Sequence, residues 1–102
     1  MSRKPPVKMD ARTAWQAWTT SGSPEAAAEF FERVGSWTDG TAAQLTRGAA
    51  HHFHCRPTRD EVADRLRHEL GRLAGGEPVT YLVALGAARR NVIDDLRSRP
   101  PA

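Results

Sequence analysis

Residues 58–73 read TRDEVADRLRHELGRL, and this stretch decides the fold class. It opens with Thr58 and has Glu61 three positions later, which is the pattern of a capping box at the start of a helix. After the cap, an apolar residue returns every three or four positions, at Val62, Leu66, Leu70 and Leu73. Most of the intervening residues are charged. The pattern predicts an amphipathic helix over about 59–74 that turns one face toward a core.

The segment downstream carries a second helical pattern. Gly75-Gly76 ends the first helix, and Pro78 stands where proline commonly opens the next one. We expect this last helix to run from about 78 to 98. Its apolar positions are Leu82, Leu85, Val92, Ile93 and Leu96.

Three more helices are predicted upstream. A short one over about 10–18 carries Trp15 and Trp18 on one face. Ser23-Pro24-Glu25 then has the cap, the first-turn proline and the first-turn acid of a helix that runs to about residue 37. Its core-facing residues are Ala27, Phe30, Phe31 and Val34. Asp39-Gly40 predicts a turn, and a helix over about 41–55 follows it.

No segment shows the alternation of a strand, and no internal repeat is present. The sequence therefore predicts an all-α fold, a compact bundle of four to five short helices in a single domain over residues 10–99. Residues 1–9, with two prolines and several basic side chains, are expected to form a disordered basic arm.

The composition indicates the cellular location of the protein and the classes of function to expect. The chain has 102 residues and one cysteine, so it forms no internal disulfide, and a reducing, cytoplasmic location is expected. No apolar run approaches the roughly 20 residues that span a bilayer, which argues against a membrane partner. No phosphate-binding glycine loop or catalytic set is evident, so we expect neither an enzyme nor a cofactor.

The charges suggest a polyanionic partner. The net charge is +3, and both ends of the chain are basic while the middle is mildly acidic. Arg89, Arg90 and Arg97 fall on a similar side of the predicted last helix, where their guanidinium groups would meet a phosphate backbone. Candidate DNA contacts are therefore Arg89, Arg90, Arg97, Arg99, Lys4 and Lys8. The same arginines could instead form an ordinary exposed helix margin.

Two other groups of residues have a functional and a structural interpretation. His51, His52, His54 and Cys55 include a helical pair with metal-ligand spacing, but the chain lacks the second pair of a structural zinc site, so no metal is expected. The alternative places these imidazoles at the negative end of a helix dipole. Trp15, Trp18 and Trp37 could stack on unpaired bases or belong to the core.

Residues 45–99 also resemble a known family. Leu45 and Ala49, the acidic opening Asp60-Glu61-Val62, Tyr81-Leu82-Val83 and the closing run 93–98 (IDDLRS) resemble the first conserved helical domain of bacterial sigma factors of the extracytoplasmic-function type. The resemblance implies that Asp60, Glu61 and Asp64 face RNA polymerase. It also implies that Arg89, Arg90, Asp94 and Arg97 lie on the promoter-facing helix. The family commonly has glutamine at the position of Asp64.

Two hypotheses follow. The first is a small transcription-associated DNA-binding module, sigma-like and able to dock on polymerase. The second is a helical protein–protein adaptor or small regulator that never contacts nucleic acid. An exposed apolar patch built from Trp15, Trp18 and Trp37 would favour the adaptor.

Overall fold

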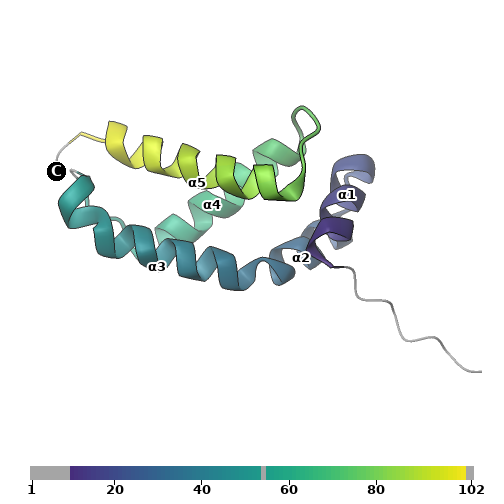
Figure 1. Ribbon diagram of the computed structural model, residues 1–102, viewed down its shortest axis with the longest axis horizontal. Coiled ribbons are helices and arrows are strands. Elements are labelled where there is room, and N and C mark those ends of the chain that lie inside the picture. Colours follow the sequence, from purple (N-terminus) through teal and green to yellow (C-terminus); the bar gives the residue numbers. More distant parts are fainter. Residues whose placement is uncertain (1–9, 54, 101–102) are drawn as a thin grey trace, which may run out of the picture.

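The computed structural model describes residues 10–53 and 55–100, without the side chains of residues 49–52, and shows five α-helices and no strand in these ranges (Figure 1). The helices are α1 (Ala11–Ser21), α2 (Pro24–Arg33), α3 (Gly35–His52), α4 (Arg59–Ala74) and α5 (Tyr81–Ser98). The predicted all-α bundle of four to five helices is confirmed. Within the described ranges, no helix combines the length and the apolar character needed to cross a membrane.

The helices form two packed groups that share α4 and α5. A short connection joins α1 and α2 into a helical hairpin, while α3 packs on α4 and α4 packs on α5. Figure 1 shows α3 and α5 running in the same direction, with α4 returning between their ends. The hairpin lies at the end of the bundle where α4 finishes and α5 begins.

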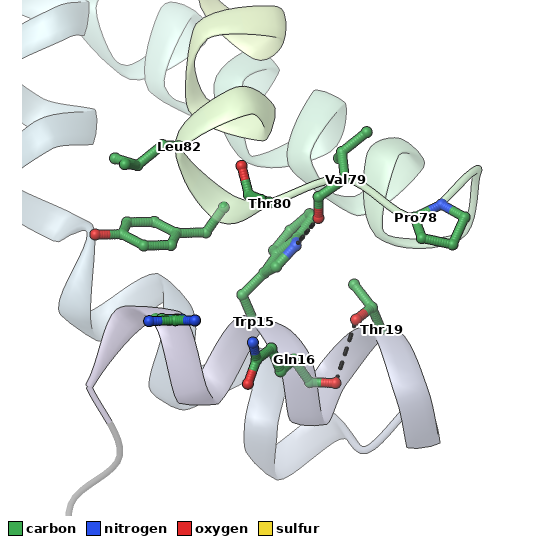
Figure 2. Close-up of a pocket in the computed structure, with 9 residues that line it drawn as sticks. Trp15, Gln16, Thr19, Pro78, Val79, Thr80 and Leu82 are labelled. Carbon is green, nitrogen blue, oxygen red and sulfur yellow. Dashed lines mark hydrogen bonds between the residues drawn. The ribbon is translucent and has the colours of Figure 1, made fainter.

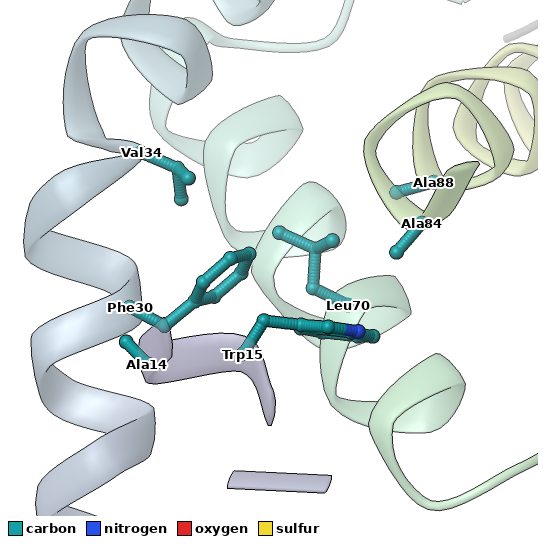
Figure 3. Close-up of a cluster of buried hydrophobic side chains, with 7 residues drawn as sticks. All are labelled: Ala14, Trp15, Phe30, Val34, Leu70, Ala84 and Ala88. Atoms are coloured by element: carbon teal, nitrogen blue, oxygen red, sulfur yellow. The ribbon is translucent and has the colours of Figure 1, made fainter. Parts of the chain in front are cut away.

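The core has two clusters of buried side chains. One joins the hairpin to the other helices and consists of Ala14, Trp15, Phe30, Val34, Leu70, Ala84 and Ala88 (Figure 3). The other lies among α3, α4 and α5 and consists of Ala42, Leu45, Val62, Ala63, Leu66, Val92 and Leu96. Since α4 and α5 contribute to both clusters, the apolar packing is continuous along the bundle.

The start of α4 matches the prediction. Thr58 Oγ1 accepts a hydrogen bond from the Glu61 backbone N–H at 3.1 Å, and Glu61 Oε1 accepts one from the Thr58 backbone N–H at 3.5 Å. Together they form the predicted capping box. The box satisfies two N–H groups that the first turn of a helix otherwise leaves without partners.

Thr58→Ala is expected to lower the free energy of unfolding by about 1 kcal/mol, because it removes the cap of a core-forming helix. Urea denaturation monitored by circular dichroism measures the change. The matched control is Thr20→Ala at an exposed position of α1, where alanine is the better helix former and the effect should be neutral or slightly stabilising. Equal losses at the two sites would show that the capping box does not stabilise α4.

Two helix boundaries upstream differ from the prediction. The expected turn at Asp39-Gly40 lies inside α3, which begins at Gly35, and α2 ends at Arg33 instead of near residue 37. The chain bends at Val34, whose φ of −99° and ψ of 12° leave the helical region. Thr38 and Ala42 are buried on either side of Asp39-Gly40. Their packing outweighs the roughly 1 kcal/mol that glycine costs within a helix.

The start and the inner face of α5 also differ from the prediction. Thr80 caps the helix, its hydroxyl accepting the Val83 backbone N–H at 3.3 Å, so Pro78 precedes α5 instead of opening it. The buried face runs through Ala84, Ala88, Val92 and Leu96, whereas Leu82 is 65% exposed. Small alanines at the first two of these positions leave room for Trp15 and Phe30, which fill the adjacent core (Figure 3).

Glu69 is a charged residue within the interface of α4 and α5. Its side chain is buried and accepts two hydrogen bonds from Arg72 Nη1 at 3.1 Å and one from Asn91 Nδ2 at 3.3 Å. The bond from Asn91 crosses from α5 to α4. These partners compensate the burial of the carboxylate, which would otherwise be costly.

Asp10 caps α1, with Oδ1 accepting the Thr13 backbone N–H at 2.7 Å. This hydrogen bond, a side-chain contact with Thr13 and the charges of Arg12 and Arg33 hold the pKa of Asp10 below its ordinary value of 3.8. A lowered folded-state pKa means that the ionised carboxylate stabilises the fold above that ordinary value. The contribution is lost as the pH falls through the lowered pKa.

Asp10→Asn keeps an acceptor for the cap and removes the titration. We expect the wild type to be more stable than this variant near neutral pH, and the difference to shrink as the pH falls below the ordinary value of 3.8 and through the lowered pKa of Asp10. Urea midpoints measured across this range test the prediction. A difference that stays constant with pH would contradict it.

Candidate nucleic-acid interface

The solvent side of α5 carries two exposed arginines. Arg90 and Arg97 lie seven positions apart, which places their side chains within roughly 20° of each other around the helix and about 10 Å apart along its axis. The opposite side of α5 is the buried alanine, valine and leucine face. We refer to Arg90 and Arg97 as the α5 arginine face.

Neither side chain of this face forms an ion pair with any other residue that the structure describes. Many of the other arginines are engaged, since ion pairs hold Arg33, Arg65, Arg67, Arg72 and Arg99. A guanidinium group without an internal carboxylate partner keeps its hydrogen-bond donors available to a ligand, and its planar fork matches the geometry of a phosphate.

Arg89 lies on the flank of α5. It is half-buried and borders a small hollow beside Gln44, Leu45 and Gly48 of α3. One position along a helix corresponds to a rotation of about 100°, so Arg89 does not share the direction of Arg90. The structure therefore puts two of the three predicted arginines on one open face and the third at the groove between α3 and α5.

Arg99 follows the end of α5 and is held by carboxylates. Its guanidinium lies 3.1 Å from Asp95 Oδ2 and 3.7 Å from Glu61 Oε2, which ties the end of α5 to the start of α4. A phosphate would have to compete with both groups. Surface ion pairs are worth little individually, so this arrangement weakens the contribution of Arg99 without removing it.

The two aspartates near these arginines have different surroundings. Asp95 is neutralised by Arg65 of α4 at 3.5 Å and by Arg99, which follows α5, at 3.1 Å. Asp94 is exposed, within one helical turn of both Arg90 and Arg97, and it reduces the positive potential of their face. The remaining positive field is modest, which favours weak and salt-dependent binding of a polyanion.

The three acids that the resemblance assigned to a polymerase surface are only partly available. Glu61 takes part in the capping box and in the ion pair with Arg99. Asp64 pairs with Arg67 at 2.9 Å. Asp60 is exposed and has no ion pair with the residues that the structure describes. The start of α4 is thus largely neutralised by its own neighbours.

Several predicted residues fall outside what is described, namely Lys4, Lys8, His54 and the side chains of His51 and His52. Cys55 is half-buried, with Sγ 3.7 Å from the carbonyl oxygen of Leu96, and it packs the α3–α4 connection against the end of α5. Among the described residues, no group of three or more candidate ligands could hold a metal ion.

The tryptophans belong to the interior. Trp15 is 2% exposed, and Trp18 and Trp37 are half-buried against the core clusters. Trp15 contacts Trp18 edge-on at 5.6 Å and Phe30 at 5.0 Å between ring centroids. These rings do not form the exposed patch that would have favoured the adaptor hypothesis. The large apolar side chains that do lie exposed in the described part are Leu82 and Val83.

The sequence prediction missed two features. Glu69 is one of the charged residues between the apolar positions of 58–73, and that pattern did not reveal that its carboxylate is buried. A groove beside Trp15 carried no local signal at all. Comparison of the chain with protein families, with curated proteins and with solved structures finds no match.

Proposed function

We propose that this chain is a small DNA-binding module that holds the phosphate backbone with the α5 arginine face. The observation that carries the proposal is the pair Arg90 and Arg97, exposed on one side of α5 and without ion pairs in the described ranges. Arg89 on the flank and Lys4 and Lys8 of the N-terminal segment would add further positive charge. Neutralising phosphates releases condensed counterions, which supplies the binding free energy.

The face carries arginines, which bind phosphates and, among the bases, guanine, but it has no amide side chain that would read adenine. Asparagine and glutamine read adenine through their amide groups. The one amide on α5, Asn91, is half-buried and donates to Glu69 instead of facing solvent. We therefore expect binding that depends on salt and that does not select adenine through an amide of α5. We extend the proposal to a role in transcription and to docking on RNA polymerase. Only the resemblance of residues 45–99 supports this extension.

Fluorescence anisotropy with labelled DNA of about 20 base pairs, roughly two helical turns, tests the proposal. Duplex, forked and single-stranded forms are compared at several salt concentrations. We expect binding to at least one form at about 50 mM salt, and a loss of affinity by about 200 mM of roughly 10-fold for two phosphate contacts or several hundred-fold for five. No binding to any form at the lowest salt would refute the proposal. Retention of polymerase subunits on the immobilised chain tests the transcription role separately.

A further inference from the structure

A groove lies at the other end of α5, between α1 and the segment 78–82 (Figure 2). Its volume is about 640 Å³. One wall is the side of α1 that carries Arg12, Gln16 and Thr19, and the indole of Trp15 lies between this wall and the segment opposite. The volume is within the range of pockets that bind ligands, and the lining is mainly apolar and aromatic.

The two walls are fixed to each other. Trp15 Nε1 donates a hydrogen bond to the carbonyl oxygen of Val79 at 2.8 Å, which joins α1 to the segment before α5 (Figure 2). The ring is buried against Trp18 and Phe30. The groove is therefore formed before any ligand arrives, and a ligand would lose little affinity to the ordering of its walls.

The rim of the groove is apolar where α5 begins. Leu82 lines it at 65% exposure, and its neighbour Val83 is 56% exposed. The inner face of α5 is completed by Ala84 and Ala88, so the fold does not need Leu82 for its core. Exposed apolar side chains beside a preformed groove are typical of a surface that a protein partner covers.

The charge of the groove indicates what kind of partner fits. Arg12 is the charged residue of the lining, it is exposed, and it forms no ion pair with the residues that the structure describes. The neighbouring Asp10 is occupied with the Thr13 backbone N–H at 2.7 Å. Arg12 lies two residues from the Asp10 carboxylate but forms no ion pair with it, so a ligand that fills the groove places its own groups next to a guanidinium that favours a carboxylate over a cation.

We propose that the groove binds a peptide segment of another protein in which a large apolar side chain stands beside an acidic one. The apolar side chain packs against Tyr81 and Leu82 above the buried ring of Trp15, and the carboxylate pairs with Arg12. The N-terminal residues of this chain have the opposite chemistry, because Arg3, Lys4 and Lys8 would meet Arg12 as like charges. The groove and the α5 arginine face then serve two different partners, an acidic peptide and a polyanionic backbone.

Selection of displayed random peptides of about 12 residues, long enough for roughly three helical turns, tests the proposal on the full chain. We expect enrichment of peptides with Leu, Phe or Trp next to Asp or Glu. Arg12→Glu should shift the enrichment toward Lys and Arg, whereas Arg47→Glu, an exposed arginine of α3, should leave the acidic preference intact. No enrichment, or enrichment that ignores the sign at residue 12, would overturn the proposal.

The position of binding is read from the indole N–H resonances of the three tryptophans in two-dimensional NMR spectra. A synthetic copy of an enriched peptide should shift the Trp15 signal and leave the Trp37 signal in place. Leu82→Ser should weaken this peptide by about 10-fold or more, as expected for a leucine that loses its buried contact, while DNA binding stays unchanged. A Trp15 signal that shifts with protein concentration would show that a second copy of the chain fills the groove. A signal that shifts on removal of residues 2–9 would show that the chain's own terminus fills it. Either result would overturn the proposal.

Discussion

Trp15→Ala is expected to lower the free energy of unfolding by about 3–5 kcal/mol, the range for deletion of a large buried aromatic side chain. Trp15 is 2% exposed, contacts Phe30 at 5.0 Å and joins α1 to the segment before α5. A domain of this size has a total stability on the order of 5–15 kcal/mol. The variant should therefore lose much of its stability, with a melting temperature lower by roughly 15–30 °C.

Thermal and urea denaturation monitored by circular dichroism measure this effect. Trp15→Phe is the informative companion, since it keeps most of the ring and removes the N–H donor to Val79. We expect it to cost about 1–3 kcal/mol, because the half-buried carbonyl of Val79 loses its partner. A Trp15→Ala protein with a melting temperature close to that of the wild type would show that the hairpin of α1 and α2 is not packed on α4 and α5 as described.

The double variant Arg90→Glu and Arg97→Glu is expected to weaken DNA binding by at least about 100-fold at low salt. Each lost contact between a guanidinium and a phosphate accounts for about 1.5–3 kcal/mol, and a factor of ten corresponds to about 1.4 kcal/mol. Both side chains are exposed, so the fold should be retained. Anisotropy titrations with labelled duplex measure the affinity, and circular dichroism checks the fold.

The control for this variant must carry the same charge. Arg12→Glu with Arg47→Glu changes two other exposed arginines, and in both double variants the net charge falls from +3 to −1. If the loss of affinity followed net charge alone, the two proteins would bind equally weakly. A control that keeps clearly more affinity than the Arg90 and Arg97 variant would locate the contact on α5.

The sequence alone predicted those features of a helix that depend on residues close together in the chain. The capping box of Thr58 and Glu61 fixed the start of α4, and the four-residue spacing of Val62, Leu66 and Leu70 fixed its buried face. The direction shared by Arg90 and Arg97 also follows from helical periodicity alone. These features depend on residues within two or three turns of each other, which a single sequence contains.

Features set by distant residues could not be predicted in this way. Asp39-Gly40 carries a turn signal, yet the burial of Thr38 and Ala42 keeps it helical. Leu82 is a large apolar residue of the kind that usually lies in a core. In α5, however, the small residues Ala84 and Ala88 face inward, because Trp15 occupies the adjacent space.

The ion pair of Arg99 with Glu61 and the groove beside Trp15 likewise join segments far apart in the chain. The spacing of residues along the sequence does not predict such contacts, because tertiary packing overrides local conformational preference.

The slope of log Kobs against log salt concentration tests the central claim most directly, because it counts the phosphates that the protein neutralises. On duplex DNA each phosphate contact contributes about 0.9 to the magnitude of the slope. Replacing Arg90 and Arg97 by glutamine should therefore reduce it by about 1.8 relative to the wild type, while Arg47→Gln should leave it unchanged. Equal slopes for the wild type and the Arg90 and Arg97 variant would contradict phosphate binding by the α5 arginine face.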